Sequence, residues 1–244
     1  MNVRKSFAVV LIGLLLAGLL LVLWPLVARQ RESFVTVLDR GKFFLYEQKD
    51  YDSAISAFAN ATQIDPHNAE AFCWLADAYR HKGESDKAIA ACNKAIRIDP
   101  KYRDAYEMRG FAYGDKGDLD KAVTDYTAAI NAGGRATCYY FRGSAYDRKG
   151  ELDKAIADYT EAIRIRPEYA KTYSERAFIY QKKGELGKAI ADCTDAIRID
   201  PKDVLAYAVR GLVYKRKGDS SKAEEDFAQA KRLGYKGKWR EVSK

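Results

Sequence analysis

Residues 136–169 read ATCYYFRGSAYDRKGELDKAIADYTEAIRIRPEY, and six versions of this pattern fill the chain from Val35 to Tyr235. Four of the five prolines repeat with it, and 34 residues separate Pro66 from Pro100. Small residues let two helices approach closely, and proline ends a helix. The spacing therefore predicts two helices per repeat, stacked as an all-α solenoid. Two alanines seven residues apart recur in every version: Ala54 and Ala61, Ala88 and Ala95, Ala122 and Ala129, Ala155 and Ala162, Ala189 and Ala196, Ala223 and Ala230.

The fourth repeat carries the residues of a known signature, namely Tyr139, Gly143, Tyr146, Ala155, Tyr159, Ala162 and Pro167. On these residues the chain resembles the tetratricopeptide repeat family. The resemblance implies an α-solenoid of helix-turn-helix repeats in a right-handed superhelix. The first repeat departs from the pattern, because Lys42 takes the position of the small residue and Leu45 that of the tyrosine. The six repeats are expected at 35–68, 69–102, 103–135, 136–169, 170–203 and 204–235.

An apolar segment precedes the repeats. Phe7–Ala28 is an uncharged run of 22 residues, between a basic tail at residues 1–6 and a short linker at residues 29–34. A helix of roughly 20 apolar residues spans a bilayer, whereas the apolar part of a cleaved signal has roughly 7–15. We therefore expect a transmembrane anchor and a single-pass protein of a bacterial-type inner or plasma membrane. The sequence Leu26-Val27-Ala28 leaves cleavage as the alternative.

The side of the membrane that holds the repeats stays open. Basic residues flank both ends of the apolar run, so the positive-inside rule does not decide the orientation. Export of the repeats is the simpler route of insertion. Free cysteines instead favour a reducing compartment, and the four in this chain have no paired spacing and are expected to be small core residues. They are Cys73, Cys92, Cys138 and Cys193.

Composition and motifs favour a binding protein over an enzyme. The two histidines, His67 and His81, have no metal-ligand spacing, and no phosphate-binding glycine loop or nucleophile motif is present. We therefore expect no catalysis, no cofactor and no metal site. The net charge of +8 is spread among many acidic residues, which does not favour nucleic acid as a partner. The basic tail at residues 236–244 is either a solvated terminus or a contact for anionic lipid.

One correlation within the repeats predicts ion pairs. An arginine at the seventh position of repeats three to six accompanies an aspartate at the twenty-third, and both are absent in Gly41 with Ala57 and in Leu75 with Ala91. We therefore expect each arginine to meet the aspartate on the partner helix of its own repeat, in a structural role. The predicted pairs are Arg109–Asp125, Arg142–Asp158, Arg176–Asp192 and Arg210–Asp226.

The sixth repeat is expected to end the solenoid. Glu224 and Lys231 replace the isoleucine or valine that most other repeats have at the same two positions. A terminal repeat needs a polar outer face because no further repeat covers it.

Function should lie on the surface that stacking leaves open. In the family that this chain resembles, the first helices line a concave groove, and aromatic residues flanked by acidic ones suit an amphipathic or peptide segment with some basic residues. The alternative is that several of these aromatic residues pack between repeats. The residues that the resemblance places in the groove are Trp74, Asp77, Glu107, Met108, Phe111, Tyr140, Phe141, Glu175, Phe178 and Leu212.

These observations predict a non-catalytic, membrane-anchored scaffold that binds a protein partner in its groove. The alternative is a structural protein that self-associates into homo-oligomers at the membrane.

Overall fold

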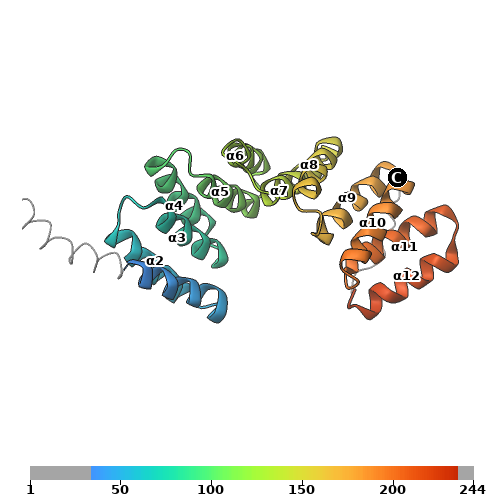
Figure 1. Ribbon diagram of the computed structural model, residues 1–244, viewed down its shortest axis with the longest axis horizontal. Helices are drawn as coiled ribbons and strands as arrows, with labels where there is room; N and C mark the ends of the chain where they lie inside the picture. Colours follow the sequence, from blue (N-terminus) through green and yellow to red (C-terminus); the bar gives the residue numbers. More distant parts are fainter. Residues whose placement is uncertain (1–33, 236–244) are drawn as a thin grey trace, which may run out of the picture. The chain divides into compact units, whose positions relative to one another are not determined.

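The computed structural model describes residues 34–235. Within these residues the chain is helical and has no strand, and it divides between Pro100 and Lys101 into two compact units (Figure 1). The predicted all-α class is confirmed. In the first unit, residues 34–42 are helical and continue into η1 (Phe43–Gln48), which is followed by α2 (Tyr51–Ile64), α3 (Ala69–His81) and α4 (Ser85–Ile98).

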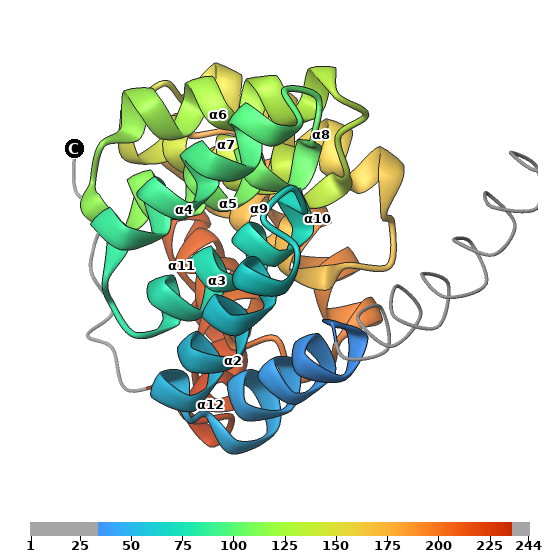
Figure 2. The ribbon, with the colours of Figure 1, turned by 90° about the vertical axis from the view of Figure 1, so that its left-hand side faces the viewer.

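The second unit consists of four helical hairpins. Each pair lies side by side in two perpendicular views, and the second helix of one hairpin packs on the first helix of the next (Figures 1 and 2). This arrangement is a solenoid of two-helix repeats within the unit. Its helices are α5 (Arg103–Lys116), α6 (Leu119–Asn131), α7 (Ala136–Arg148), α8 (Leu152–Ile165), α9 (Ala170–Lys183), α10 (Leu186–Ile199), α11 (Val204–Lys217) and α12 (Ser220–Arg232).

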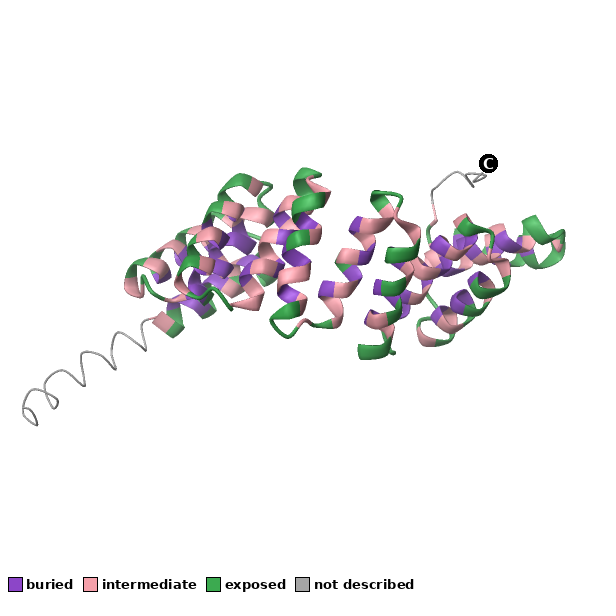
Figure 3. Cartoon of the chain, turned by 90° about the horizontal axis from the view of Figure 1, so that it is seen from above, coloured by how far each residue is buried: buried purple, intermediate pink, exposed green. Residues whose placement is uncertain are grey.

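Small residues set the distance between the helices of a hairpin. A Cβ atom added to Gly110 would lie 2.7 Å from Cε1 of Tyr126, so only glycine fits this crossing without a shift. The recurrent alanines are buried on the faces that meet, while the turns are exposed (Figure 3). The sequence period therefore reports helix–helix contact directly.

The turns follow from local chemistry. Gly117 ends α5 in the left-handed conformation with φ of 82°, where a side chain would be strained. Asp118 then caps α6, because its carboxylate accepts a hydrogen bond from the backbone N–H of Lys121 at 3.3 Å.

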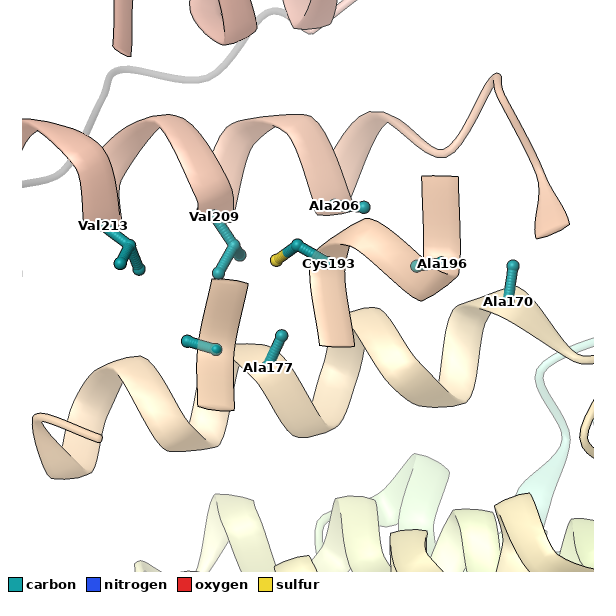
Figure 4. Packing of buried hydrophobic residues seen from close by; sticks show 8 residues of the cluster. Ala170, Ala177, Cys193, Ala196, Ala206, Val209 and Val213 are labelled. Carbon is teal, nitrogen blue, oxygen red and sulfur yellow. The ribbon is translucent and has the colours of Figure 1, made fainter. Parts of the chain in front are cut away.

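A buried cluster of the second unit shows how the repeats stack. Ala170 and Ala177 of α9 face Cys193 and Ala196 of α10, and Val209 of α11 lies over them (Figure 4). Cys193 is fully buried, as are the other three cysteines apart from a small exposed fraction of Cys73. The cysteines thus pack as small apolar residues.

The first repeat corrects one sequence prediction. Thirteen positions separate Gly41 from Ala54, whereas twelve separate Gly110 from Ala122, so the first repeat has one extra residue. The π-helix η1 absorbs it. A Cβ atom on Gly41 would lie 2.5 Å from the ring of Phe58, which shows that Gly41 holds the small-residue position. The assignment of Lys42 to that position is wrong.

The same shift moves the arginine position. In the corrected register Arg40 corresponds to the paired arginines of later repeats, and Ala57 still stands where they have aspartate. The first repeat therefore keeps the arginine and lacks the carboxylate, so the expectation that both charges are lost together holds for the second repeat alone. Lys49 takes the place of the turn glycine and has a φ of 55°.

Two further expectations concern the ends of the described region. Glu224 and Lys231 are exposed on α12, as a polar terminal face requires. No helix among residues 34–235 is long and apolar enough to cross a membrane. The expected anchor at residues 7–28 and both basic tails lie outside the described residues, and the predicted linker does so except for Phe34, which is already helical.

Candidate functional site

The structure joins each of the four arginines to the aspartate sixteen residues later, across the two helices of one hairpin. In the pair Arg142–Asp158, Nε and Nη2 donate to the two carboxylate oxygens at 2.8 and 2.7 Å. This two-bond geometry suits a guanidinium facing a carboxylate. All eight such bonds measure 2.7–2.9 Å, in Arg109–Asp125, Arg142–Asp158, Arg176–Asp192 and Arg210–Asp226.

Three of these arginines also connect neighbouring repeats. Nη1 of Arg142 donates to Oγ1 of Thr127 on the preceding hairpin at 2.9 Å. The same contact joins Arg176 to Thr160 and Arg210 to Thr194. The signal in the sequence is a threonine that recurs at intervals of 33 and 34 residues, and its role was not predicted. These side chains are structural, since they fasten three helices together.

Turn lysines make a second set of links between repeats. Lys149 Nζ contacts Asp120 of the preceding repeat at 2.6 Å, and Lys183 contacts Asp153 in the same manner. The aspartates are largely exposed, so each pair contributes little to stability. Basic residues suit the end of a helix and acidic residues its beginning, which explains where these residues occur. The structure adds that they also make a contact between repeats.

In the first unit, the predicted groove residues serve the fold. The Trp74 ring stacks on Phe58 with centroids 6.0 Å apart, and its Nε1 donates to Glu70 at 3.0 Å. Asp77 is 5% exposed and accepts hydrogen bonds from the Tyr46 hydroxyl at 2.7 Å and from Arg80 at 3.1 Å. Asp77 therefore positions side chains of two repeats and offers little to a partner.

Glu107 has the same character in the second unit. It is 4% exposed, and the Thr137 hydroxyl of the next hairpin donates to it at 2.6 Å. Met108 beside it is half-buried. The half-buried ring of Phe111 meets the ring of Phe141 edge-on, with centroids 4.5 Å apart. Aromatic packing between repeats, the alternative interpretation, thus accounts for part of the predicted set.

Tyr140 and Phe141 are neighbours in sequence with different surroundings. Tyr140 is 8% exposed, and its hydroxyl donates to Glu175 of α9 at 3.3 Å. Burial raises the pKa of Tyr140 and also that of the Glu175 carboxyl. Phe141 is 38% exposed and belongs to the few large apolar side chains on the surface of the described residues. Lys171 Nζ lies 5.8 Å above the Tyr140 ring.

A hollow of about 110 Å³ opens beside these rings, between α7, the end of α8 and the start of α9. Phe141 and Tyr169 line it, and both are among the exposed large side chains. A broader hollow of about 560 Å³ shares Tyr169 and extends along α9 to α11. Tyr169 was not predicted from the sequence, because it lies in the connection before α9 and not on a first helix. The lining of the smaller hollow is Ala136, Thr137, Tyr140, Phe141, Ala162, Arg166, Tyr169 and Thr172.

Phe178 and Leu212 stand farther along the same unit, and both are half-buried. Lys182 Nζ covers the Phe178 ring at 4.5 Å and also contacts Asp147 of the preceding repeat at 2.6 Å. Phe178 also packs against the buried cluster of α9, α10 and α11. Phe141 and Tyr169 are therefore the exposed aromatic pair at this site.

The described part of the site has neither a metal-binding group nor a reactive cysteine. Within residues 34–235, no group of histidine, cysteine, aspartate and glutamate side chains is arranged to hold a metal ion. Burial raises the pKa of the Cys138 thiol to about 11, which keeps it protonated and unreactive.

Comparison with known proteins identifies the family. Profiles described as tetratricopeptide repeat match residues 45–110, 104–132, 170–203 and 204–233, and one described as TPR repeat matches residues 143–184. The crystal structure of MamA is 31% identical over 65% of this chain and 94% of that one, with a TM-score of 0.61. The chain belongs to the tetratricopeptide repeat family.

Two other solved structures share the fold. YrrB, described as a TPR protein with an unusual peptide-binding site, is 21% identical over 74% of this chain and 94% of its own, with a TM-score of 0.63. PilW, described as a widely conserved type IV pilus biogenesis factor, is 18% identical over 82% of this chain and 92% of its own, with a TM-score of 0.73. No curated protein matches the chain significantly.

Proposed function

We propose that the chain is a non-catalytic scaffold, anchored in a membrane by residues 7–28, that binds a protein partner on the first helices of the hairpins in its second unit. The observation that carries the proposal is the pair of exposed rings, Phe141 and Tyr169, at the hollow between α7, α8 and α9. Exposed aromatic side chains around a hollow are typical of anchors in protein interfaces.

The partner that fits best is a peptide or amphipathic segment with apolar anchors and some basic residues. The smaller hollow, at about 110 Å³, has room for a side chain and is below the roughly 300 Å³ of small-molecule pockets. The half-buried Glu175 has a raised pKa, and a cation supplied by the partner would relieve the cost of its charge. YrrB, which shares the fold, provides a precedent for peptide binding.

The anchor determines where binding takes place. Residues 29–33 separate the apolar run from the first described helix, so the repeats stay close to the bilayer. We propose that this membrane is an inner or plasma membrane of bacterial type, and the proposal holds whichever side of it the repeats occupy. We also propose that the six repeats follow a right-handed superhelical path.

Site-specific photocrosslinking in native membranes tests the proposal. A photoreactive phenylalanine analogue replaces Phe141 in the full-length protein, and a matched variant carries it at the exposed Ala157 on α8, which does not line the hollow. We expect the first variant alone to yield an adduct with another protein, which mass spectrometry identifies. Equal adducts from both positions would contradict groove binding. Adducts formed solely with the chain itself would instead support the self-associating alternative.

Phe141→Ala adds a quantitative check once the partner is known. Loss of an aromatic anchor should weaken binding by about 2 kcal/mol or more, roughly thirtyfold in affinity. The melting temperature should fall only moderately, because the ring is 38% exposed but also meets the ring of Phe111 edge-on. A lower melting temperature with unchanged affinity of the folded protein would place this ring in the core.

A further inference from the structure

The first helix of the first repeat presents an exposed face with apolar and basic side chains. Val35 is 53% exposed and Phe43 is 50% exposed, the largest fractions among the exposed apolar side chains of the described region. Successive residues of a helix turn by about 100°, which places Phe43 near the centre of the exposed arc and Asp39 and Arg40 on either side of it. Later first helices bury the position that corresponds to Phe43, since Ala145, Ile179 and Val213 are at most 5% exposed.

Arg40 is the basic member of this face. In repeats three to six a carboxylate of the same hairpin neutralises the corresponding arginine, but Ala57 stands in its place here. Arg40 is exposed and has no ion-pair partner among residues 34–235. It borders an open hollow of about 380 Å³ together with Phe44, Asp52, Ser53, Ser56 and Asn60. The Asp52 carboxylate is paired with Lys82 at 2.6 Å. A guanidinium beside hydroxyl and amide groups is suited to an anionic oxygen such as that of a phosphate.

The length of chain before this helix points to the occupant. Five residues, 29–33, separate the apolar run from Phe34, and six extended residue steps reach at most about 20 Å. If residues 7–28 span a bilayer, Phe34 stays within that distance of the lipid headgroups, and Phe43 lies nine residues, roughly 14 Å, farther along the helix. Aromatic and basic side chains are enriched at that depth. Asp39 and Glu47 are exposed acidic residues of the same helix and oppose anionic lipid.

We propose that this exposed face, centred on Phe43 and Arg40, rests on the phospholipid headgroup layer. The inference rests on the proposed anchor and adds a second membrane contact, which fixes the orientation of the first repeat at the bilayer. A second copy of the chain fits less well, because the α12 surface that would stack on this face presents Glu224 and Lys231 where most other second helices have isoleucine or valine.

The experiment measures how close Phe43 lies to lipid in the full-length protein. An environment-sensitive fluorophore is attached to Phe43→Cys, or to Ile165→Cys as the matched control, which is 42% exposed on α8. The native cysteines are at most 6% exposed, so the new thiol reacts selectively. The protein is reconstituted into phosphatidylcholine vesicles, with and without phosphatidylglycerol, that carry headgroup spin labels in both leaflets.

We expect severalfold stronger quenching by the spin label at position 43 than at position 165. Adding Arg40→Gln should abolish the extra quenching that phosphatidylglycerol produces, whereas Arg164→Gln, an exposed arginine on α8, should not. Equal quenching at both positions in protein that floats with the vesicles would overturn the inference and leave the anchor intact. Quenching that depends on protein density and not on the spin label would assign the face to a second copy. Failure of the full-length chain to float would overturn the anchor and this inference together.

Discussion

Removing one carboxylate from the arginine–aspartate series should destabilise the second unit strongly. In Asp158→Ala the Arg142 guanidinium loses two hydrogen bonds of 2.8 and 2.7 Å. Its side chain is only 17% exposed, so water replaces the carboxylate poorly. Breaking a buried pair costs about 3–5 kcal/mol. We expect about 3 kcal/mol, the lower end, because Arg142 keeps its hydrogen bond to Thr127 and a partly solvated edge.

The second repeat supplies the matched control. It has Leu75 and Ala91 at the two positions, and both are buried. The double variant Arg142→Leu/Asp158→Ala copies this solution, so we expect its stability to stay within about 1 kcal/mol of the natural protein. Urea unfolding of the full-length protein in mild detergent, followed by circular dichroism, gives the double-mutant cycle. If Asp158→Ala lowers the free energy of unfolding by less than about 0.5 kcal/mol, the pair behaves like an exposed ion pair. That result would refute the claim that burial makes its loss costly.

Three further variants test local features by the same unfolding measurement. Lys49→Gly should stabilise the protein by about 0.5–1 kcal/mol, since glycine adopts the left-handed conformation at φ of 55° without strain. An unchanged urea midpoint would show that Lys49 is not strained. Gly110→Ala should destabilise by about 1–3 kcal/mol because its Cβ would lie 2.7 Å from Tyr126, whereas Gly114→Ala in the same helix, with 3.8 Å of room, should be neutral or stabilising. Burial raises the pKa of Glu175, so its contribution to stability is full below the unfolded pKa and is lost as pH rises through the folded pKa. Glu175→Gln should therefore have a higher free energy of unfolding than the natural protein at neutral pH, and this difference should shrink in mild acid. A difference that does not change with pH would refute the raised pKa of Glu175.

The helical hairpins could be predicted from the sequence because the residues that recur in every repeat are those that make the contacts between helices. Alanine or glycine recurs where two backbones meet, and glycine recurs where a helix must end, so position alone predicts both. The register of the first repeat could not be predicted in this way. A π-helix accommodates the extra residue before Ala54, and a pattern of fixed spacing then assigns Lys42 to a position that Gly41 holds. An insertion inside a helix changes register without leaving a gap, so only the contact with Phe58 reveals it.

The acidic residues of the predicted groove were harder to interpret for a different reason. Asp77 and Glu107 are at positions that face a groove in related repeats, yet each is buried and accepts a hydrogen bond from a hydroxyl of a neighbouring repeat, Tyr46 and Thr137 respectively. Spacing within one repeat cannot reveal a partner that belongs to the next. The same limit explains why Tyr169, in a connection between repeats, was missed.

Tyr140 and Phe141 show why binding must be measured one side chain at a time. Adjacent residues on a helix differ by about 100° in direction. Here that rotation buries Tyr140 against Glu175 and leaves Phe141 at the surface. Truncating Tyr140 would therefore remove a packed ring and lower stability, which would also reduce binding indirectly. Truncating Phe141 removes a ring that is 38% exposed and also meets Phe111, so its effect on binding reports the interface once the stability of the variant has been measured. A partner that loses affinity with Phe141→Ala in a protein of unchanged stability must contact this edge of the hollow.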